Sequence, residues 1–387
     1  MYKQKKTITI EGTAERFFAG LIENDVLTEY HRFSLTDPVV LGCIVKGQVQ
    51  KESGTLHSYY VNLQMDHPGF WNAGHPVKGG TQPIVQIIQE PRGKKGYRVT
   101  EHYTIPGHYL VLTPFDTRVH VSLRIEDPAE QQRLREMAHA LPGDGRVGWI
   151  LRTEALHADS ESILTEGAYL YDLYSKIENR GITAPVGAIL YEPVHPLISF
   201  LSSTGLTQED EIVCEDKELL RQLQMMKDLP RQLIPLFKLF DQGRWSLSEF
   251  YKIRSALDAA SRREVPLPGG GSIVIDETEA LIVIDVNSGG SAARGSSRED
   301  SIFNVNAKAC PVITEQIRLR NLSGIIIIDF IDMKRDSDRE KLLELMKRNA
   351  KKDRQRVTIH GYTHLGLMEL SRKRESVPLA AMLADPH

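Results

Sequence analysis

Two aspartates that each follow a short apolar run are the residues of this sequence best suited to chemistry. Residues 280–284 are apolar throughout and precede Asp285, and residues 325–328 are four isoleucines that precede Asp329. Runs that are apolar at every position, rather than at alternate ones, are typical of parallel strands buried on both faces. The intervening chain is long enough for a crossover helix, which predicts a right-handed βαβ unit with both strands ending at one edge of the sheet. We therefore expect the two carboxylates to meet there, where their repulsion requires a cation.

The residues next to the aspartates suit a magnesium ion. Asn287 follows Asp285 by two positions, so strand alternation places both side chains on one face. Carboxylate and amide oxygens are the ligands that hard cations prefer, and Mg²⁺ held by one or two carboxylates supplies what phosphodiester hydrolysis needs. Asp332 follows Asp329 by three positions, either as a further partner of the site or as an N-cap. Arg356 precedes another apolar segment, 357–359, which we expect to lie in the same sheet.

A structural role for the acidic pair is the alternative. The aspartates could cap helices or pair with arginines of the Ser- and Gly-rich loop 288–297, which contains Arg294 and is followed by Arg298. The same arginines and the loop amides could instead contact a phosphate backbone. For a single strand-end aspartate the structural role would be favoured. We favour the metal site because two such aspartates end neighbouring strands and Asn287 is aligned with one of them.

The composition excludes several classes of protein. With 387 residues, 41% of them hydrophobic and 26% charged, the chain is expected to form about two to four globular domains. No segment approaches the roughly 20 apolar residues of a membrane span, and the start lacks the apolar core of a signal peptide. The net charge of −3 does not indicate nucleic-acid binding, and a solvated helix face explains the basic segment 334–356 equally well. Cys43, Cys214 and Cys310 are far apart and form no C-x-x-C, which argues against disulfides and zinc and favours a cytoplasmic setting.

The pattern of strands and helices predicts several smaller domains before the aspartates. Residues 1–36 are expected to form one or two strands and a short helix near residues 14–23. Short strands at 40–49, 59–63, 82–88 and 97–100 predict a small closed β-barrel of the kind that binds single-stranded nucleic acid. Its candidate contacts are Tyr60, Phe70, Trp71, Lys94 and Lys95, unless the aromatic residues fill the barrel. An αβ segment follows, with strands at 109–114, 119–122 and 147–153 and helices at 128–141 and 162–179, and residues 217–237 are strongly helical.

Five segments around the aspartates resemble the catalytic region of the ribonuclease E/G family. They are residues 270–281 (GGSIVIDETEAL), 284–288 (IDVNS), 319–324 (LRNLSG), 328–333 (IDFIDM) and 365–374 (LGLMELSRKR). Upstream, residues 93–96 and 107–112 look like the exit from that family's S1 barrel, and residues 151–153 (LRT) look like its pocket for an RNA 5′-monophosphate. The long, ordered set of segments makes a chance match very improbable.

The resemblance implies an α+β multidomain fold. In it an RNase H-like domain (residues 1–36 and 188–260) is interrupted by an S1, OB-type β-barrel (37–103) and a 5′-sensor domain (104–187). A DNase I-like α/β catalytic domain (261–387) follows. By position Asp285 and Asp329 would hold the metal, Asn287 would orient it and Arg356 would contact the scissile region.

The resemblance also implies a Mg²⁺-dependent endoribonuclease with one catalytic ion per chain. Its partner would be single-stranded, A/U-rich RNA, preferably 5′-monophosphorylated, and its role RNA processing or decay in the cytoplasm. Tyr60, Phe70 and Lys95 would contact RNA, and Arg152 and Thr153 would hold the 5′-phosphate through a guanidinium and a hydroxyl.

Two departures from the family pattern affect these expectations. The family commonly continues into a Cys-Pro-x-Cys motif that shares zinc between protomers, whereas this sequence ends at Asp385-Pro386-His387. Zinc is therefore not expected, and a homo-oligomer, if formed, need not be zinc-linked. Pro311 lies inside the expected crossover helix and should kink it or delay its start.

The alternatives to the proposed nuclease are a non-catalytic S1-type RNA-binding regulator and a nuclease acting on DNA.

Overall fold

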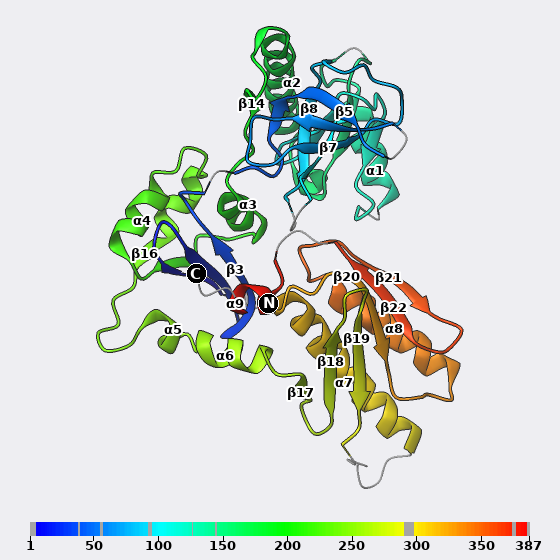
Figure 1. Cartoon of the computed structure of the whole chain (residues 1–387). Helices are drawn as coiled ribbons and strands as arrows, with labels where there is room; N and C mark the ends of the chain where they lie inside the picture. Colours follow the sequence, from blue (N-terminus) through cyan, green and yellow to red (C-terminus); the bar gives the residue numbers. More distant parts are fainter. Residues whose placement is uncertain are drawn as a thin grey trace. The chain divides into compact units, whose positions relative to one another are not determined.

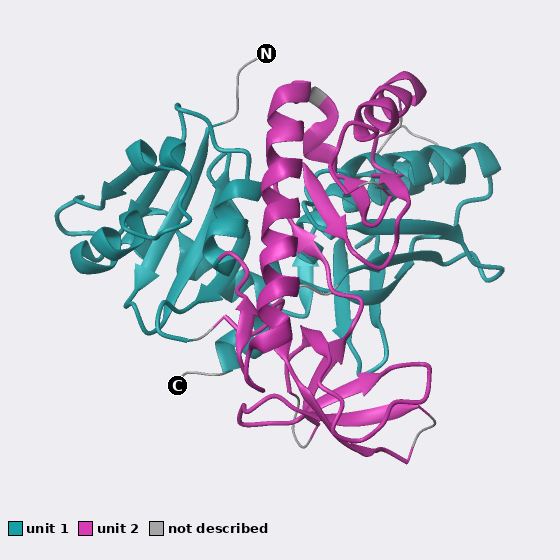
Figure 2. Cartoon of the chain, turned by 90° about the horizontal axis from the view of Figure 1, so that it is seen from above, with its two compact units in different colours: residues 1–37, 195–387 teal, residues 38–194 magenta. Residues whose placement is uncertain are grey.

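The computed structural model describes residues 5–37, 39–54, 57–91, 95–125, 127–143, 145–289, 298–373 and 377–384. The chain divides into two compact units, coloured separately in Figure 2: unit 1 comprises residues 1–37 and 195–387, and unit 2 comprises residues 38–194. The described residues form four sheets with helices between them, so the protein is a multidomain α+β protein. Within those ranges no helix combines the length and apolarity that crossing a membrane requires.

The first sheet of unit 1 joins the beginning of the chain to residues beyond 195 (Figure 1). Its order is β16-β15-β1-β2-β3, and β1 pairs in parallel with β15. The strands are β1 (Lys6–Gly12), β2 (Phe17–Glu23), β3 (Val26–Phe33), β15 (Glu211–Cys214) and β16 (Phe237–Leu239). Buried side chains of α3 (Pro196–Ser203), α4 (Lys217–Gln224) and the 3-10 helix η2 (Arg231–Leu236) share one core with this sheet. Side chains of α5 (Leu247–Phe250), α6 (Ile253–Ala260) and α9 (Leu379–Ala384) form a second core with β2 and β3.

The helix expected near residues 14–23 is wrong, because that segment forms strand β2. Asn24 and Asp25 have φ angles of 53° and 62°, and the residues on either side of them, Glu23 and Val26, pair with each other. Two central residues with positive φ make the tight turn that matches the twist of a β-hairpin, and Asn and Asp tolerate this conformation. The turn therefore commits residues 17–33 to two antiparallel strands.

The helix expected over residues 217–237 is correct only for its first part. Helix α4 ends at Gln224, and residues 231–236 form η2. Pro230 and Pro235 lie in this stretch, and proline lacks an N–H and disfavours helical backbone in the residue before it. Phe237 then begins β16, which pairs with β15.

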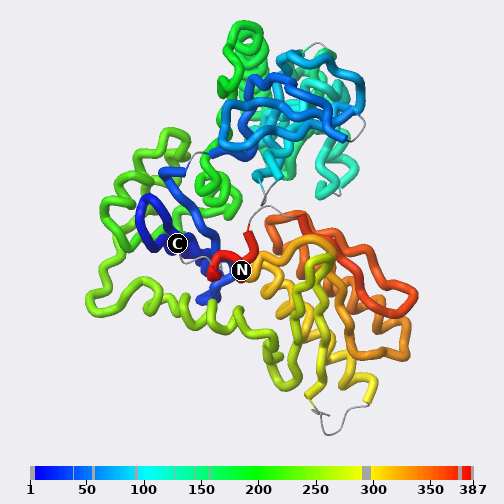
Figure 3. The backbone as a smooth tube through the Cα atoms, in the orientation of Figure 1, coloured from blue at the N-terminus to red at the C-terminus, as the bar shows by residue number. Residues whose placement is uncertain are grey.

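The second sheet of unit 1 carries the two carboxylate-ended strands. Its order is β17-β18-β19-β20-β22-β21, with strands β17 (Glu264–Pro266), β18 (Ser272–Glu277), β19 (Ile282–Asn287), β20 (Gly324–Asp329), β21 (Val357–Tyr362) and β22 (Met368–Arg372). Strands β19 and β20 are parallel neighbours, as predicted. The helices α7 (Arg298–Leu319) and α8 (Asp336–Ala350) contribute buried residues to one core with this sheet. In Figure 3 the yellow and orange parts of the trace follow this region, and the red end of the trace is α9.

The crossover helix α7 continues through Pro311, so the expected delay of its start is wrong. The hydroxyl of Thr314 donates to the carbonyl of Pro311 at 2.9 Å and lies 3.2 Å from that of Cys310. Side chains on both sides of the proline, such as Val305 and Ile317, belong to the same buried core. Packing against the sheet therefore compensates for the backbone hydrogen bond that Pro311 cannot donate.

A buried ion network ties helix α7 to strand β3 within unit 1. The carboxylate of Glu29, a residue only 4% exposed, accepts hydrogen bonds from Arg318 Nη2 at 2.9 Å and Arg354 Nε at 3.0 Å. His31 Nε2 lies 3.1 Å from the same carboxylate, and Arg318 also pairs with Glu23 at 2.9 Å. Two guanidinium groups thus hold one buried carboxylate, which links the first sheet of unit 1 to the helix behind the second.

The larger sheet of unit 2 curls around a core of its own. Its order is β14-β4-β8-β9-β7-β6-β5, with strands β4 (Ile44–Lys46), β5 (Gln48–Glu52), β6 (Ser58–Asn62), β7 (Gly69–Asn72), β8 (Ile84–Gln89), β9 (Tyr97–Thr100) and β14 (Ile189–Tyr191). The strand expected over residues 40–49 is divided at Gly47, so that β4 pairs with β8 and β5 pairs with β6. A Cβ atom at Gly47 would lie 2.4 Å from Val61 Cγ1, so glycine is needed at this bend.

The smaller sheet of unit 2 has the order β10-β11-β13-β12 and two helices. Its elements are β10 (Ile105–Pro106), β11 (Leu110–Thr113), β12 (Val119–Val121), β13 (Gly148–Leu151), α1 (Pro128–Ala138), the 3-10 helix η1 (Thr153–His157) and α2 (Ser160–Thr183). The predicted strands and helices of this segment are confirmed. Asp127 and Asp159 begin the two helices by accepting hydrogen bonds from the backbone of Ala129 and Ser162.

Candidate functional site

Asp285 and Asp329 are directly opposite each other on neighbouring parallel strands. They form the last register pair between β19 and β20, and both side chains are exposed. Ile284 and Val286 on either side of Asp285 are buried, so strand alternation turns the carboxylate away from the core. The side chain of Asn287 lies on the same face, and its Nδ2 donates to Asp285 Oδ2 at 2.8 Å. The structure thus brings together three of the four residues expected at the catalytic centre.

The electrostatics of this edge favour a cation. Burial, then the negative charges of Asp285 and Asp332, raise the pKa of Asp329 above its ordinary value. The carboxylates therefore repel one another, and a divalent cation between them would remove that penalty. Asp332 contributes to this field as a side chain of the site, and the N-cap of α8 is Arg335 instead.

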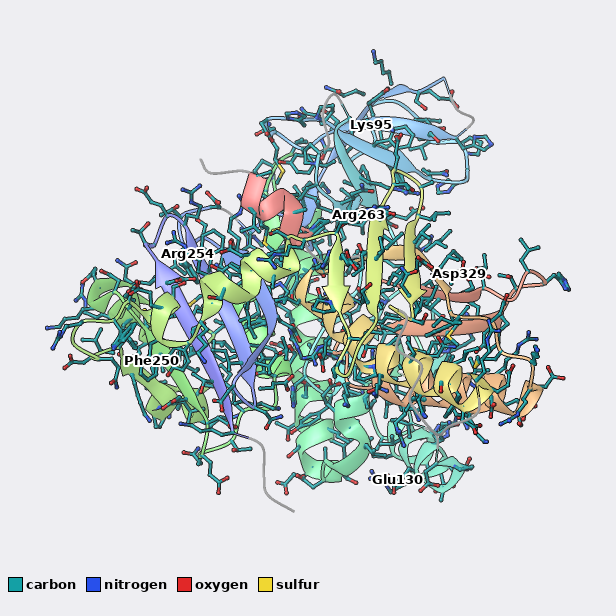
Figure 4. The ribbon with its side chains drawn as sticks, turned by 90° about the horizontal axis from the view of Figure 1, so that it is seen from below. Lys95, Glu130, Phe250, Arg254, Arg263 and Asp329 are labelled. Carbon is teal, nitrogen blue, oxygen red and sulfur yellow. The ribbon has the colours of Figure 1, made fainter. Side chains whose placement is uncertain are left out.

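The site is a hollow of about 320 Å³ at the carboxyl edge of the sheet. It is lined by Asp285, Val286, Asn287, Ser288, Asp329, Phe330, Ile331 and Asp332. Among the residues that the structure describes, no group of three or more His, Cys, Asp or Glu side chains is arranged to hold a metal. Mg²⁺ commonly binds one or two carboxylates and keeps several waters, so the pair of aspartates is a donor set that fits it. Figure 4 labels Asp329.

Arg356 is not brought to the aspartates. It directly precedes Val357, the first residue of β21, which is the register partner of Arg372 on β22. Arg372 is in turn the register partner of Gly324, the first residue of β20. Asp329 lies five residues further along β20, roughly 16 Å away along the strand direction. Arg356 therefore lies at the opposite end of this sheet. The loop arginine Arg294 is outside the described residues, and Arg298 is the first residue of α7.

A buried asparagine that the sequence did not single out fixes the loop after Asp329. Asn306 of α7 is 0% exposed, its Nδ2 donates to the carbonyl of Ile331 at 2.8 Å, and its Oδ1 accepts from the amide of Ile331 at 3.1 Å. One side chain thus satisfies both backbone polar groups of Ile331, a residue in the wall of the hollow. The only sequence signal is a polar residue on the apolar face of the crossover helix, where an unpaired amide would be costly.

Replacing Asn306 with alanine is expected to weaken Mg²⁺ binding about tenfold, the size of effect seen when groups that orient metal ligands are removed. Loss of the two hydrogen bonds frees the Ile331 peptide and lets the loop that follows Asp329 move. Isothermal titration with Mg²⁺ measures the change. Asn349→Ala is the matched control, because Asn349 is also buried but its Nδ2 donates to the carbonyl of Leu345 within its own helix. Unchanged Mg²⁺ affinity in a folded Asn306→Ala protein would contradict the role.

An aromatic and basic strip lies on one face of the larger sheet of unit 2. Tyr60 and Phe70 are cross-strand partners with ring centroids 6.0 Å apart, edge to face, and both are half-buried. Lys51 Nζ lies 5.6 Å from the centroid of the Tyr60 ring, and the exposed Arg98 is level with Phe70. Rings flanked by cations form a surface on which bases of a single strand can stack. The apolar–polar alternation of residues 97–99 was the sequence signal for Arg98.

The other barrel candidates are divided among core, surface and the undescribed part of the chain. Trp71 is 2% exposed and packs in the core of this sheet. It is therefore a core residue and not a candidate RNA contact. Lys95 is exposed and is labelled in Figure 4. Lys94 lies outside the described residues.

Arg152 and Thr153 lie side by side at the end of β13 in unit 2. Arg152 Nη1 donates to the carbonyl of Gly107 at 2.6 Å, and its Nε lies 3.4 Å from Glu154 Oε2. The hydroxyl of Thr153 is 3.1 Å from that of Ser122, which follows the parallel neighbour β12. A guanidinium and hydroxyls on adjoining residues are groups that can hold a phosphate.

A carboxylate fixes the backbone beside Arg152. Glu166 of α2 accepts hydrogen bonds from the amides of Tyr109 at 2.7 Å and Leu110 at 2.9 Å, and also from the amide of His108. A Cβ at Gly107 would lie within 2.9 Å of this carboxylate. The Glu166 clamp therefore sets the position of the Gly107 carbonyl that Arg152 contacts.

Similarity to known proteins agrees with this geometry. A model of the "Ribonuclease E/G family" matches residues 104–375. A ribonuclease G from Haemophilus influenzae is 30% identical over 396 aligned residues, which cover 95% of this chain and 79% of that protein. A ribonuclease G from Escherichia coli K12 is 29% identical, covering 94% and 79%. A ribonuclease E from Synechocystis is 34% identical over 306 residues, covering 78% of this chain and 45% of that protein.

Proposed function

Because the chain belongs to the ribonuclease E/G family, we propose that it is an endoribonuclease that hydrolyses single-stranded, A/U-rich RNA with Mg²⁺ in RNA processing or decay. We propose in addition that it prefers RNA with a 5′-monophosphate. The observation that carries the proposal is the register pair Asp285–Asp329, with Asn287 aligned on the same exposed face.

In this proposal Asp285 and Asp329 hold one Mg²⁺ and Asn287 orients it. Bound there, Mg²⁺ would lower the pKa of a water and stabilise charge on the phosphoryl oxygens. The protein holds the carboxylates at one sheet edge, and Asn306 fixes the wall of the hollow that receives the phosphodiester. Water adds to phosphorus in line and the bond from phosphorus to the 3′ oxygen breaks, which leaves a 3′-hydroxyl and a 5′-phosphate.

The domain assignment is part of the same proposal. Residues 1–36 and 188–260 would be RNase H-like, residues 37–103 the S1 barrel, residues 104–187 the 5′ sensor and residues 261–387 the DNase I-like catalytic domain. The two units follow these bounds except at residue 37, which belongs to unit 1, and at residues 188–194, which belong to unit 2 and whose strand β14 pairs with β4 of the barrel segment. Tyr60, Phe70 and Lys95 would contact RNA, and Arg152 and Thr153 would hold its 5′-phosphate.

One experiment separates this function from its alternatives. The protein is incubated with RNA and DNA oligonucleotides of the same sequence, in Mg²⁺ or in EDTA. We expect cleavage of RNA only, and only in Mg²⁺. RNA binding without cleavage would indicate a regulator, cleavage of DNA would indicate a different nuclease, and cleavage of RNA in EDTA would refute the metal site.

Arg152→Ala is expected to reduce the rate advantage of 5′-monophosphorylated over 5′-hydroxyl RNA by about tenfold, because charge-assisted hydrogen bonds are worth about 1.5–3 kcal/mol. The ratio of kcat/KM values on the two substrates measures it. Arg135→Ala removes a guanidinium from the exposed face of α1 in the same unit and is the control. Equal rates of the unaltered protein on both substrates would remove the sensor from the proposal.

A further inference from the structure

Arg152 is already partly neutralised by a carboxylate of its own segment. Glu154, in the first turn of η1, places Oε2 3.4 Å from Arg152 Nε, and the two side chains are 39% and 40% exposed. An ion pair in this environment is weak and open to exchange, because solvent screens it. Any anion that uses Arg152 must therefore compete with Glu154.

The other partner of Arg152 is far less able to move. The carbonyl of Gly107 is backbone, and the three amides that follow it are held by the carboxylate of Glu166. A phosphate that accepts two parallel hydrogen bonds from the guanidinium needs N–H groups of Arg152. Some of these groups now face the carbonyl of Gly107 and the carboxylate of Glu154. Of these two, the side chain of Glu154 is the one that can rotate away into solvent.

The competition depends on charge. A terminal phosphate monoester carries about −1.5 to −2 near neutral pH and offers three strong acceptor oxygens, whereas a carboxylate carries −1. A 5′-monophosphate can therefore displace Glu154, and the hydroxyl of the next residue, Thr153, which lies 3.1 Å from that of Ser122, is a further hydrogen-bond donor. A 5′-hydroxyl offers no charge that compensates for breaking the ion pair.

We propose that Glu154 is a specificity-determining residue that competes with the RNA 5′ end for Arg152 and so sets the charge needed to enter the site. The inference rests on the proposed role of Arg152 as the 5′-phosphate contact. As a consequence, the site binds monophosphorylated RNA ends less tightly with Glu154 present than it would without this carboxylate. Removing the carboxylate makes the site more receptive to phosphate of any source.

The test is an equilibrium binding measurement in EDTA, where RNA is not cleaved. Fluorescence anisotropy gives the Kd of one labelled single-stranded oligonucleotide with a 5′-monophosphate or a 5′-hydroxyl. In Glu154→Gln the ratio of the hydroxyl Kd to the monophosphate Kd is expected to rise about 3- to 5-fold, the size of effect of losing one exposed ion pair. Inorganic phosphate should also displace the monophosphorylated oligonucleotide at a correspondingly lower concentration.

Matched variants separate this inference from the sensor itself. Asp172→Asn removes a carboxylate from the exposed pair with Lys176 on α2 of the same unit and should leave the ratio at the wild-type value. A wild-type ratio that exceeds one and falls to one in Arg152→Ala supports the sensor. If the ratio is then unchanged or lower in Glu154→Gln, the role of Glu154 is overturned and the sensor stands. A wild-type ratio of one overturns both. Glu154→Ala must give the same direction as Glu154→Gln.

Discussion

Asparagine in place of Asp285 or of Asp329 is expected to lower RNA cleavage by roughly a thousand-fold or more, because metal stabilisation of the phosphoryl charge is worth several kcal/mol and each 1.36 kcal/mol is tenfold in rate. Each substitution removes one of the two carboxylates that face each other across β19 and β20. RNA binding in EDTA should persist, because the proposed RNA contacts Tyr60 and Phe70 belong to unit 2. Single-turnover cleavage and anisotropy measure the two quantities separately.

Loss of activity through misfolding can be recognised in these variants. Burial and the charges of Asp285 and Asp332 raise the pKa of Asp329, so the carboxylates oppose one another when no cation is bound. Either asparagine variant should therefore be at least as heat-stable as the wild type in EDTA and should lose the stabilisation given by Mg²⁺. Asp276→Asn, on the neighbouring strand β18 and paired with Arg263, is the control for charge removal. Cleavage above a tenth of the wild-type rate in either variant refutes the assignment.

The second large effect is expected at a site without any catalytic role. Glu29→Gln should destabilise the protein by about 3–5 kcal/mol, because removing one partner of a buried ion pair leaves uncompensated charge. In this case the partners left behind are Arg318, with a side chain 8% exposed, and Arg354. Urea unfolding followed by circular dichroism gives the change in midpoint. Glu218→Gln, which breaks an exposed pair with Arg221, should leave the midpoint where it is.

The same network predicts sensitivity to acid. Burial by itself would raise the pKa of Glu29, but hydrogen bonds from His31 and Arg354 outweigh it and lower the pKa well below its ordinary value of 4.5. A carboxylate with a lowered folded-state pKa stabilises the fold above its unfolded pKa and loses that contribution as the pH falls toward the folded value. The difference in urea midpoint between wild type and Glu29→Gln should therefore be largest near neutral pH and shrink below pH 4.5. A difference that grows on acidification would contradict the network.

The central unit of the site could be predicted from the sequence because its pattern is local and strong. Two runs of apolar residues, each ending at an aspartate, and an intervening helical segment allow few topologies other than a right-handed crossover. The structure confirms the parallel pair and helix α7, and places Asn287 where strand alternation predicts it. Periodicity also found most strands of the larger sheet of unit 2, although not β7, and the strands and helices around Arg152.

The parts that the sequence did not predict depend on long-range register or on single turns. Nothing in the segment around Arg356 indicates that β22 returns antiparallel between β20 and β21, which places Arg356 at the far end of the sheet. The positive φ angles of Asn24 and Asp25 turned an expected helix into a hairpin. Asn306 has its partner, Ile331, 25 residues away, so no local pattern could reveal the contact.

The discontinuity of unit 1 has a consequence for synthesis on the ribosome. Thr7 of β1 pairs in register with Glu211 of β15, and 204 residues separate them. At roughly 5–20 residues per second, β1 waits about 10–40 s for its partner strand to be translated. During that interval all of residues 38–194 are made and can fold, while β1 presents an unpaired edge beside its hairpin neighbour β2. Nascent chains of this protein should therefore be most prone to strand-mediated association, and most in need of a chaperone, between the completion of unit 2 and the emergence of β15.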